Sequence, residues 1–496
     1  MLADAGLVGR GANIARVAEK APFVCLTAAL AYLVSPINFW LLFRNTDWLN
    51  AYPSRTDLAV AAAPALGLLA VGGLTLLASN TTAAIRAAWA GPLAKAIWLL
   101  GVIGVVSGVY GLLRHNSLGL IASDFLPIAE LIGFYFLTIN SVKTVSGAVT
   151  LALWTVGSLV STIALRVYFF LPAVDALPRF AAGYQHGLYG TGVTALFVIG
   201  RIMPRLPLLQ SAAWLLPFTL AYAFRGPDKR IRFALGFAAA MLGIAIYLSF
   251  ERGLWLFAAV GVGVVVLEGL RSSWRQPPSR RSLLVGLAIG LLAYGAVAAV
   301  IRAEPLTTGL DRLGYTFVQL NSVNPLSHKR QDELKGILAD LGPGGSAGAT
   351  GAPRPALLVL GLGLGATYRG PTGSLDTNYV AQAHDTKHYT YDTYLAVLLR
   401  MGIVGEIGLL LAFGVLTLYA SLAWWRSPTP AARIMGAAVV GALAGVALMS
   451  FVDPYLLAHP ITIFEGVTAA LVVRMAPLNS GLGRPQSPRT RLVERR

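Results

Sequence analysis

The sequence predicts an all-α polytopic membrane protein with about twelve transmembrane helices and one large loop on the outer face. Of its 496 residues, 56% are hydrophobic and only 12% are charged, and the mean hydropathy is +0.66. A soluble domain carries about 25% charged residues, so a surface this poor in charge cannot face water throughout. The apolar residues gather in runs of about 20, the length that a helix needs to cross the hydrocarbon core. A secreted domain held by disulfides is excluded, because Cys25 is the sole cysteine.

The spans follow one another along the chain when that length is used as a ruler. Between residues 187 and 224 the chain has to cross the membrane a net odd number of times, and Pro204 and Pro207 interrupt this stretch. We expect a short outer half-helix and then one full span there, with three short crossings as the open alternative. The other spans are expected at residues 21–43, 58–78, 96–113, 118–139, 147–171, 233–250, 254–270, 282–301, 403–424, 435–451 and 458–473.

The distribution of charge orients these spans. The chain has 39 Lys and Arg against 22 Asp and Glu, a formal net charge of +17. The basic residues form clusters between apolar runs, at residues 225–232, 271–281 and 484–496. Loops rich in Lys and Arg stay on the cytoplasmic side of a membrane. Both termini are therefore expected in the cytoplasm, and the positive charge does not indicate a nucleic-acid partner.

Runs and charges together divide the chain into five segments. They are a cytoplasmic N-terminal segment (1–20), transmembrane helices one to nine with short loops (21–301), a large outer loop with its closing helix (302–402), transmembrane helices ten to twelve (403–474) and a basic cytoplasmic tail (475–496).

The outer loop contains an apolar run, residues 356–360, that has the composition of a strand and leads into Gly361-Leu-Gly-Leu-Gly365. A nucleotide-binding fingerprint needs a following helix and an acidic residue about 20 positions later inside a parallel α/β unit. This loop lies outside the membrane, so we reject the nucleotide interpretation. The glycines are expected to let the backbone turn tightly beside a ligand or the membrane surface.

Two arginines on the outer face are candidates for binding an anion. Arg252 lies in a tight turn between two apolar runs, opposite the basic loops, and Arg179 lies in the outer loop before the interrupted stretch. Two guanidinium groups that face each other suit a diphosphate, because each offers planar paired donors and stays charged. The alternative for Arg252 is a pair with the adjacent Glu251 or an approach to lipid headgroups.

Histidine supplies the candidate for proton transfer, since it can accept a proton at neutral pH. His384 and His388 precede the helix that closes the outer loop, and their spacing of four places them on one face if that stretch is helical. A zinc site formed with Asp385 is an alternative, although the sequence has no HExxH motif and no cysteine pair. The other alternative is that each histidine is an ordinary solvated residue of the loop.

The order of four motifs resembles the O-antigen ligase and O-antigen polymerase superfamily of bacterial membrane transferases. Arg179 with residues 183–187 resembles an outer loop of that family, and residues 249–253 resemble its Ser-Arg-Gly turn. The glycine run at residues 361–365 resembles the one in its large periplasmic loop. Residues 391–405 resemble its His-Asn-x-Tyr-Leu helix, which ends in Gly-Ile-x-Gly.

The resemblance implies an inverting, metal-independent glycosyl transfer, without a cofactor, on the periplasmic face of the inner membrane. The donor would be an oligosaccharide linked to undecaprenyl diphosphate, and the acceptor a glycan or the lipid A-core. Arg179 and Arg252 would neutralise the diphosphate leaving group, and His388 would take the proton of the acceptor hydroxyl. His384 and Asp392 are the fallback bases. Further substrate contacts are expected from Glu251, Tyr184 and Tyr394, with the tyrosines stacking on sugars.

One departure from the family pattern affects the choice between ligase and polymerase. Where ligases carry His followed by Asn, this chain has Tyr391 followed by Asp392, and His388 lies one turn earlier. The sequence leans toward a polymerase without excluding a ligase.

Three other functions stay open at this point. A transporter or flippase of lipid-linked sugars would carry charges at mid-depth and two similar halves, whereas the notable charges here lie at the outer ends of spans. A scaffold protein would leave the outer Arg and His residues unexplained. A peptidoglycan-polymerising glycosyltransferase would need an acidic catalytic residue, for which Asp376 and Asp385 are the loop candidates.

Overall fold

The computed structural model describes most of the predicted transmembrane part of the chain. The described residues are 20–35, 37, 55–174, 207–225, 229–248, 252–273, 288, 336–338, 341, 354–369, 386–387, 392–427, 430–451, 456–457 and 461–475.

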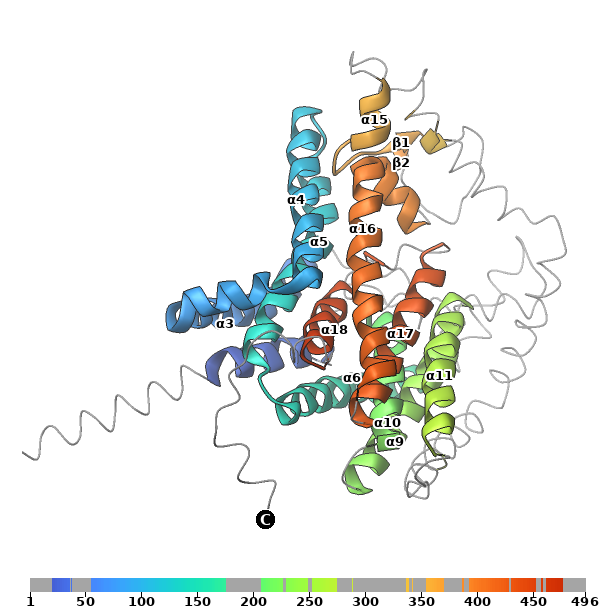
Figure 1. Ribbon diagram of the computed structural model, residues 1–496. Coiled ribbons are helices and arrows are strands. Elements are labelled where there is room, and N and C mark those ends of the chain that lie inside the picture. The colour runs from blue at the N-terminus through green and yellow to red at the C-terminus, as the bar shows by residue number, and fades with distance from the viewer. Residues whose placement is uncertain are drawn as a thin grey trace, which may run out of the picture.

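The described residues form a helical bundle with one small two-stranded ribbon (Figure 1). The ribbon pairs β1 (Tyr368–Arg369) with β2 (Thr386–Lys387) in the antiparallel sense. The labelled helices are α3 (Arg55–Trp89), α4 (Gly91–Leu113), α5 (Leu118–Ser141), α6 (Val145–Val174), α9 (Pro207–Arg225), α10 (Lys229–Leu248), α11 (Arg252–Ser273), α15 (Arg354–Leu360), α16 (Thr393–Arg426), α17 (Pro430–Met449) and α18 (Ile461–Met475).

Six of the described helices are long and apolar enough to cross a membrane, so the chain is a multi-pass α-helical membrane protein. Three shorter apolar helices accompany them, at Lys20–Leu33, Ala63–Ala78 and Leu209–Phe224. The predicted count of about twelve spans also draws on residues outside the described part, among them most of the run at 282–301 and the half-helix before α9.

Small residues let the helices in the middle of the bundle approach closely. A Cβ atom on Gly441 of α17 would lie 2.8 Å from the carbonyl oxygen of Gly261 in α11, and one on Gly445 would lie 2.7 Å from that of Phe257. Beside this contact, the fully buried Trp214 of α9 meets the ring of Phe257 edge-on, with centroids 6.2 Å apart. Close backbone approach of this kind is how membrane helices associate without a hydrophobic driving force between them.

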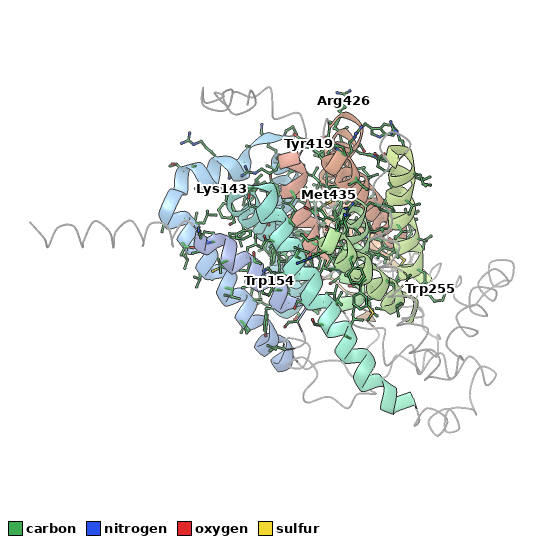
Figure 2. The ribbon with its side chains drawn as sticks, turned by 90° about the horizontal axis from the view of Figure 1, so that it is seen from below. Lys143, Trp154, Trp255, Tyr419, Arg426 and Met435 are labelled. Carbon is green, nitrogen blue, oxygen red and sulfur yellow. The ribbon has the colours of Figure 1, made fainter. Side chains whose placement is uncertain are left out.

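Contacts at both ends define the directions of neighbouring helices. Helices α4 and α16 run antiparallel, because Ser107 meets Arg400 near one end and Gly91 meets Tyr419 near the other. We call the end at which α4 finishes and α16 begins the outer end, following the predicted orientation. Figure 1 shows α15 and both strands at this end. Figure 2 views the bundle from the opposite end, with Arg426 at the periphery and side chains between the helices.

One local prediction differs from the structure. The run at residues 356–360 is not a strand but the end of helix α15, which has Pro355 in its first turn, where a helix tolerates proline. A short apolar run does not by itself separate a strand from a buried helix, and here Leu357 is buried beside Leu399 of α16. The label α16 covers two helical stretches that meet at a sharp turn at Gly402, with φ 64° and ψ −164°, the residue at which the predicted closing helix ends.

The orientation of the bundle gives a first testable prediction. In a Cys25→Ala background, a membrane-impermeant maleimide should label Ser117→Cys in right-side-out vesicles and Arg426→Cys only in inverted ones. Both positions are exposed and lie at opposite ends of the bundle. Labelling of Arg426→Cys from outside would reverse the predicted orientation.

Candidate functional site

The structure describes three of the eight residues with a predicted role. Asp392 and Tyr394 are described in full, and Arg252 is described as the first residue of α11, without its side chain. The other five lie outside the described residues: Arg179, Tyr184, Glu251, His384 and His388. Asp385 of the alternative zinc site lies outside them as well. Within the described ranges, no group of three or more His, Cys, Asp or Glu side chains could hold a metal ion.

The glycine run forms a tight turn between α15 and the outer ends of α4, α5 and α16. Gly361, Gly363 and Gly365 have φ values of +72°, +85° and +78°. A residue with a side chain adopts this left-handed region at a cost of roughly 1–2 kcal/mol. A Cβ atom on Gly363 would lie 2.5 Å from the backbone of Gly111 in α4, and one on Gly361 would lie 2.6 Å from the backbone nitrogen of Gly402. The glycines therefore bring backbone against backbone within the protein, where the sequence predicted a ligand or the membrane surface.

Hydrogen bonds hold this turn in place. The amide of Asn116, in the turn between α4 and α5, donates to the carbonyl oxygens of Leu362 at 3.2 Å and Leu364 at 2.9 Å. The backbone N–H of Leu362 donates to Leu399 of α16 at 2.7 Å, and that of Leu364 donates to Ser107 of α4 at 3.1 Å. Polar backbone groups buried at the end of a membrane bundle need such partners.

A buried ion pair completes the attachment. Asp124 Oδ2 of α5 accepts the backbone N–H of Gly365 at 2.7 Å and lies 3.0 Å from Nε of Arg400 in α16. The two side chains are only 7% and 15% exposed. Removing one member of a buried pair costs about 3–5 kcal/mol, because a charge is left uncompensated. Hydropathy does not indicate that these two residues meet, although an ionisable residue inside an apolar run is a signal that the sequence does contain.

Asp392 has a defined structural role as the N-cap of α16. Its Oδ1 accepts the backbone N–H groups of Tyr394 at 2.8 Å and Leu395 at 3.2 Å. A cap of this kind satisfies N–H groups that the first turn of a helix leaves without partners. Both of these bonds use Oδ1, so the cap itself does not require Oδ2.

The segment after Asp392 is fixed to the C-terminal end of α17. The backbone N–H of Thr393 donates to the carbonyl of Ser450 at 3.0 Å, and the hydroxyl of Tyr394 donates to that of Ala447 at 3.3 Å. The ring of Tyr394 also packs against Phe451, with centroids 4.6 Å apart. Tyr394 was predicted to stack on a sugar, and one of its contacts is this ring of the protein itself.

The first turn of α11 meets the same end of α17. A Cβ atom on Gly253 would overlap the side chain of Met449, so the backbone beside Arg252 lies directly against α17. We call this meeting point the α17 junction and define it by residues 252–253, 392–394 and 449–451. It brings two segments that are far apart in the sequence, and that both carry predicted site residues, to the outer end of the bundle.

Glu406 is a further polar residue near the junction. At Gly402 the chain turns so sharply that a Cβ atom on Gly405 would lie 3.1 Å from Val397. A straight helix would separate positions eight apart by about 12 Å. The carboxyl of Glu406 comes within electrostatic range of Asp392, and its Oε1 is buried without a hydrogen-bond partner. The pattern of apolar residues does not indicate this residue, because it contains no information on how sharply the chain turns at Gly402 and so on which side chains the turn brings together.

No family model matches this chain, and no curated protein matches it. The functional interpretation therefore depends on the order of the motifs and on the geometry of the outer end.

The glycine turn gives a second testable prediction. Gly363→Ala should lower the free energy of unfolding by more than about 2 kcal/mol, because it adds left-handed strain to an overlap with the backbone of α4. Thermal unfolding of the purified protein in detergent measures the loss. Gly414→Ala in α16 is the matched control, since a Cβ atom there has nothing within 4 Å. Equal melting temperatures for the two variants would contradict the close approach.

Proposed function

We propose that this protein is a membrane glycosyltransferase that acts on the periplasmic face of the bacterial inner membrane. It transfers or polymerises an oligosaccharide linked to undecaprenyl diphosphate, in the manner of an O-antigen or exopolysaccharide polymerase or an O-antigen ligase. The reaction inverts the anomeric centre and uses neither a metal nor a cofactor.

The observation that carries this proposal is the α17 junction. The start of α11, where Arg252 lies, and the start of α16, with Asp392 and Tyr394, pack against the same end of α17. The glycine turn lies at that end of the bundle as well, through its bonds to α4 and α16. Two of the four motifs that resemble the superfamily thus meet at one end of α17, and the third lies at the same end of the bundle, which supports a site there. The fourth, around Arg179, is outside the described residues.

The proposed chemistry uses charge stabilisation and one proton transfer. Arg252 and Arg179 bind the diphosphate and stabilise the negative charge that builds on it as the glycosidic bond breaks. The hydroxyl of the acceptor glycan attacks the anomeric carbon, and His388 accepts its proton. The lipid tail of the donor lies among the spans, in the membrane.

The pair Tyr391-Asp392 favours the polymerase type within this proposal, because ligases carry His-Asn at the matching positions. In a polymerase the acceptor is a second lipid-linked oligosaccharide, whereas in a ligase it is the lipid A-core.

Transport of lipid-linked sugars is the second candidate, and one observation favours it. Glu130 lies near the middle of α5, and Glu465 of α18 is fully buried in the bundle. Ionisable groups are therefore not confined to the outer ends of the spans, and intramembrane carboxyls are characteristic of transport proteins.

A reconstituted transfer assay gives the third prediction. With undecaprenyl-diphosphate oligosaccharide as donor and EDTA present, the protein should form longer lipid-linked chains or glycosylate a lipid A-core acceptor. Arg252→Lys should lower this rate more than about tenfold, because lysine keeps the charge but lacks the paired donors. Arg426→Lys, at the inner end, is the matched control and should retain the wild-type rate.

Two outcomes of this assay would oppose the proposal. Wild-type product from Arg252→Lys would remove Arg252 from the site. No product with either acceptor, together with movement of the donor between leaflets, would replace the transferase with a transporter.

The cap of α16 gives a fourth prediction, which separates structure from chemistry at Asp392. Asp392→Ala should lower the free energy of unfolding by about 1 kcal/mol, while Asp392→Asn keeps the cap and the stability. Because His388 is the proposed base, Asp392→Asn should also keep the transfer rate. A stable but inactive Asp392→Asn would instead assign the base to Asp392.

A further inference from the structure

Glu465 is an acidic residue that none of the proposed chemistry uses. It lies in α18 with an exposed fraction of 0%. Both of its carboxyl oxygens are buried, and neither has a hydrogen-bond partner. No ion pair recorded among the described residues includes it.

The neighbours of Glu465 along α18 show which helices enclose it. Thr462 donates to Oε2 of Glu130 in α5 at 2.9 Å, and the backbone at Gly466 lies against Leu131 of the same helix. Thr468 faces α9, where Nε1 of Trp214 lies 3.4 Å from its hydroxyl. Successive residues of a helix are about 100° apart. Glu465 therefore points between the face that α18 turns to α5 and the face that it turns to α9.

The charged groups on the surrounding helices have other partners or locations. Arg400 of α16 pairs with Asp124, and Arg474 of α18 donates to the carbonyl of Ile139. Tyr135 of α5 is buried, and its hydroxyl has no hydrogen-bond partner. The remaining titratable or charged side chains described on the helices around α18 are Glu130 (α5), Tyr222 (α9), Tyr394, Glu406, Tyr419 and Arg426 (α16) and Arg433 (α17).

An ionised carboxylate at such a position would lose its hydration without gaining a cation or a donor in exchange. A buried carboxylate without water, a cation or a donor is highly unfavourable. A buried acid avoids this charged state by keeping its proton. A neutral carboxylic acid is tolerated at far lower cost.

We propose that Glu465 is a proton-binding site inside the membrane bundle. Its carboxyl holds a proton at neutral pH, when a glutamate in water is ionised. It releases the proton to water, leaving a carboxylate, only when water enters the contact between α5, α9 and α18. Thr462 and Glu130 then provide hydrogen-bonding groups for that water. The ligand of this site is the proton. The inference does not depend on the proposed glycosyltransferase activity.

Infrared spectroscopy tests the protonation state directly. The difference spectrum between the full-length wild type and Glu465→Gln, at neutral pH in detergent or lipid, should contain the carbonyl band of a protonated carboxylic acid. Glu130→Gln is the matched control, because Glu130 lies on the adjacent helix and already accepts a hydrogen bond. A difference spectrum with carboxylate bands in place of the acid band would overturn the proposal.

Unfolding at different pH values supplies a second readout. An unfolded glutamate ionises at about pH 4.3. Above that pH the folded protein should bind one proton more than the unfolded chain, so its stability falls as the pH rises from there through neutral. This part of the pH dependence should be absent from Glu465→Gln, which stays neutral and has nearly the same shape. An unchanged pH dependence would contradict the proposal.

A carbodiimide that reacts with protonated carboxyls in apolar surroundings adds a third readout. It should modify Glu465 in the wild type, and the modification should disappear in Glu465→Gln. Protection by sodium ions would indicate that the site binds a metal cation rather than a proton and would also overturn the proposal.

Discussion

The outer end of this protein depends on the direct approach of one backbone to another. The turn at residues 361–365 lies so close to α4 and α16 that no side chain fits between them, and its polar groups are satisfied by those helices. Asp124 joins the turn to α5 and to Arg400 through one carboxylate oxygen. Because Arg400 and Gly402 belong to α16, the same contacts hold the sharp turn of α16 in place, and the glycines permit this approach. The start of α16, with Asp392 and Tyr394, is held to α17 by its own hydrogen bonds.

The apolar runs predicted the helices well because the length of a membrane span is set by the bilayer. The run at residues 118–139, for example, is α5 at Leu118–Ser141. The run at residues 356–360 was assigned to a strand because five apolar residues carry no period that distinguishes the two states. The polar contacts were harder to predict. Asp124 and its partner Arg400 come from segments far apart in the sequence, and so do the helices that enclose Glu465. Hydropathy contains no information about which spans are neighbours. The motif order identified the outer ends of α11 and α16, but it did not predict that α17 joins them.

Two kinds of polar environment coexist in the bundle. At the outer end, charged and polar groups are tied to backbone atoms and to one another, as in the pair of Asp124 and Arg400 or the cap formed by Asp392. Within the bundle, Glu465 has no such partners. A rigid, satisfied network and an isolated acid serve different purposes, because the first resists change and the second responds to the entry of water.

The contact between Gly361 and Gly402 also restricts how the sequence can evolve. Each glycine occupies the space that a side chain on the other would need, and each has a positive φ. When a large residue crowds a core, a neighbour can usually shrink and restore the fit. Here neither neighbour can become smaller, so a substitution at one position has no compensating substitution at the other. We expect such a pair to drift very little among descendants of this sequence, even if every residue that contacts substrate were exchanged.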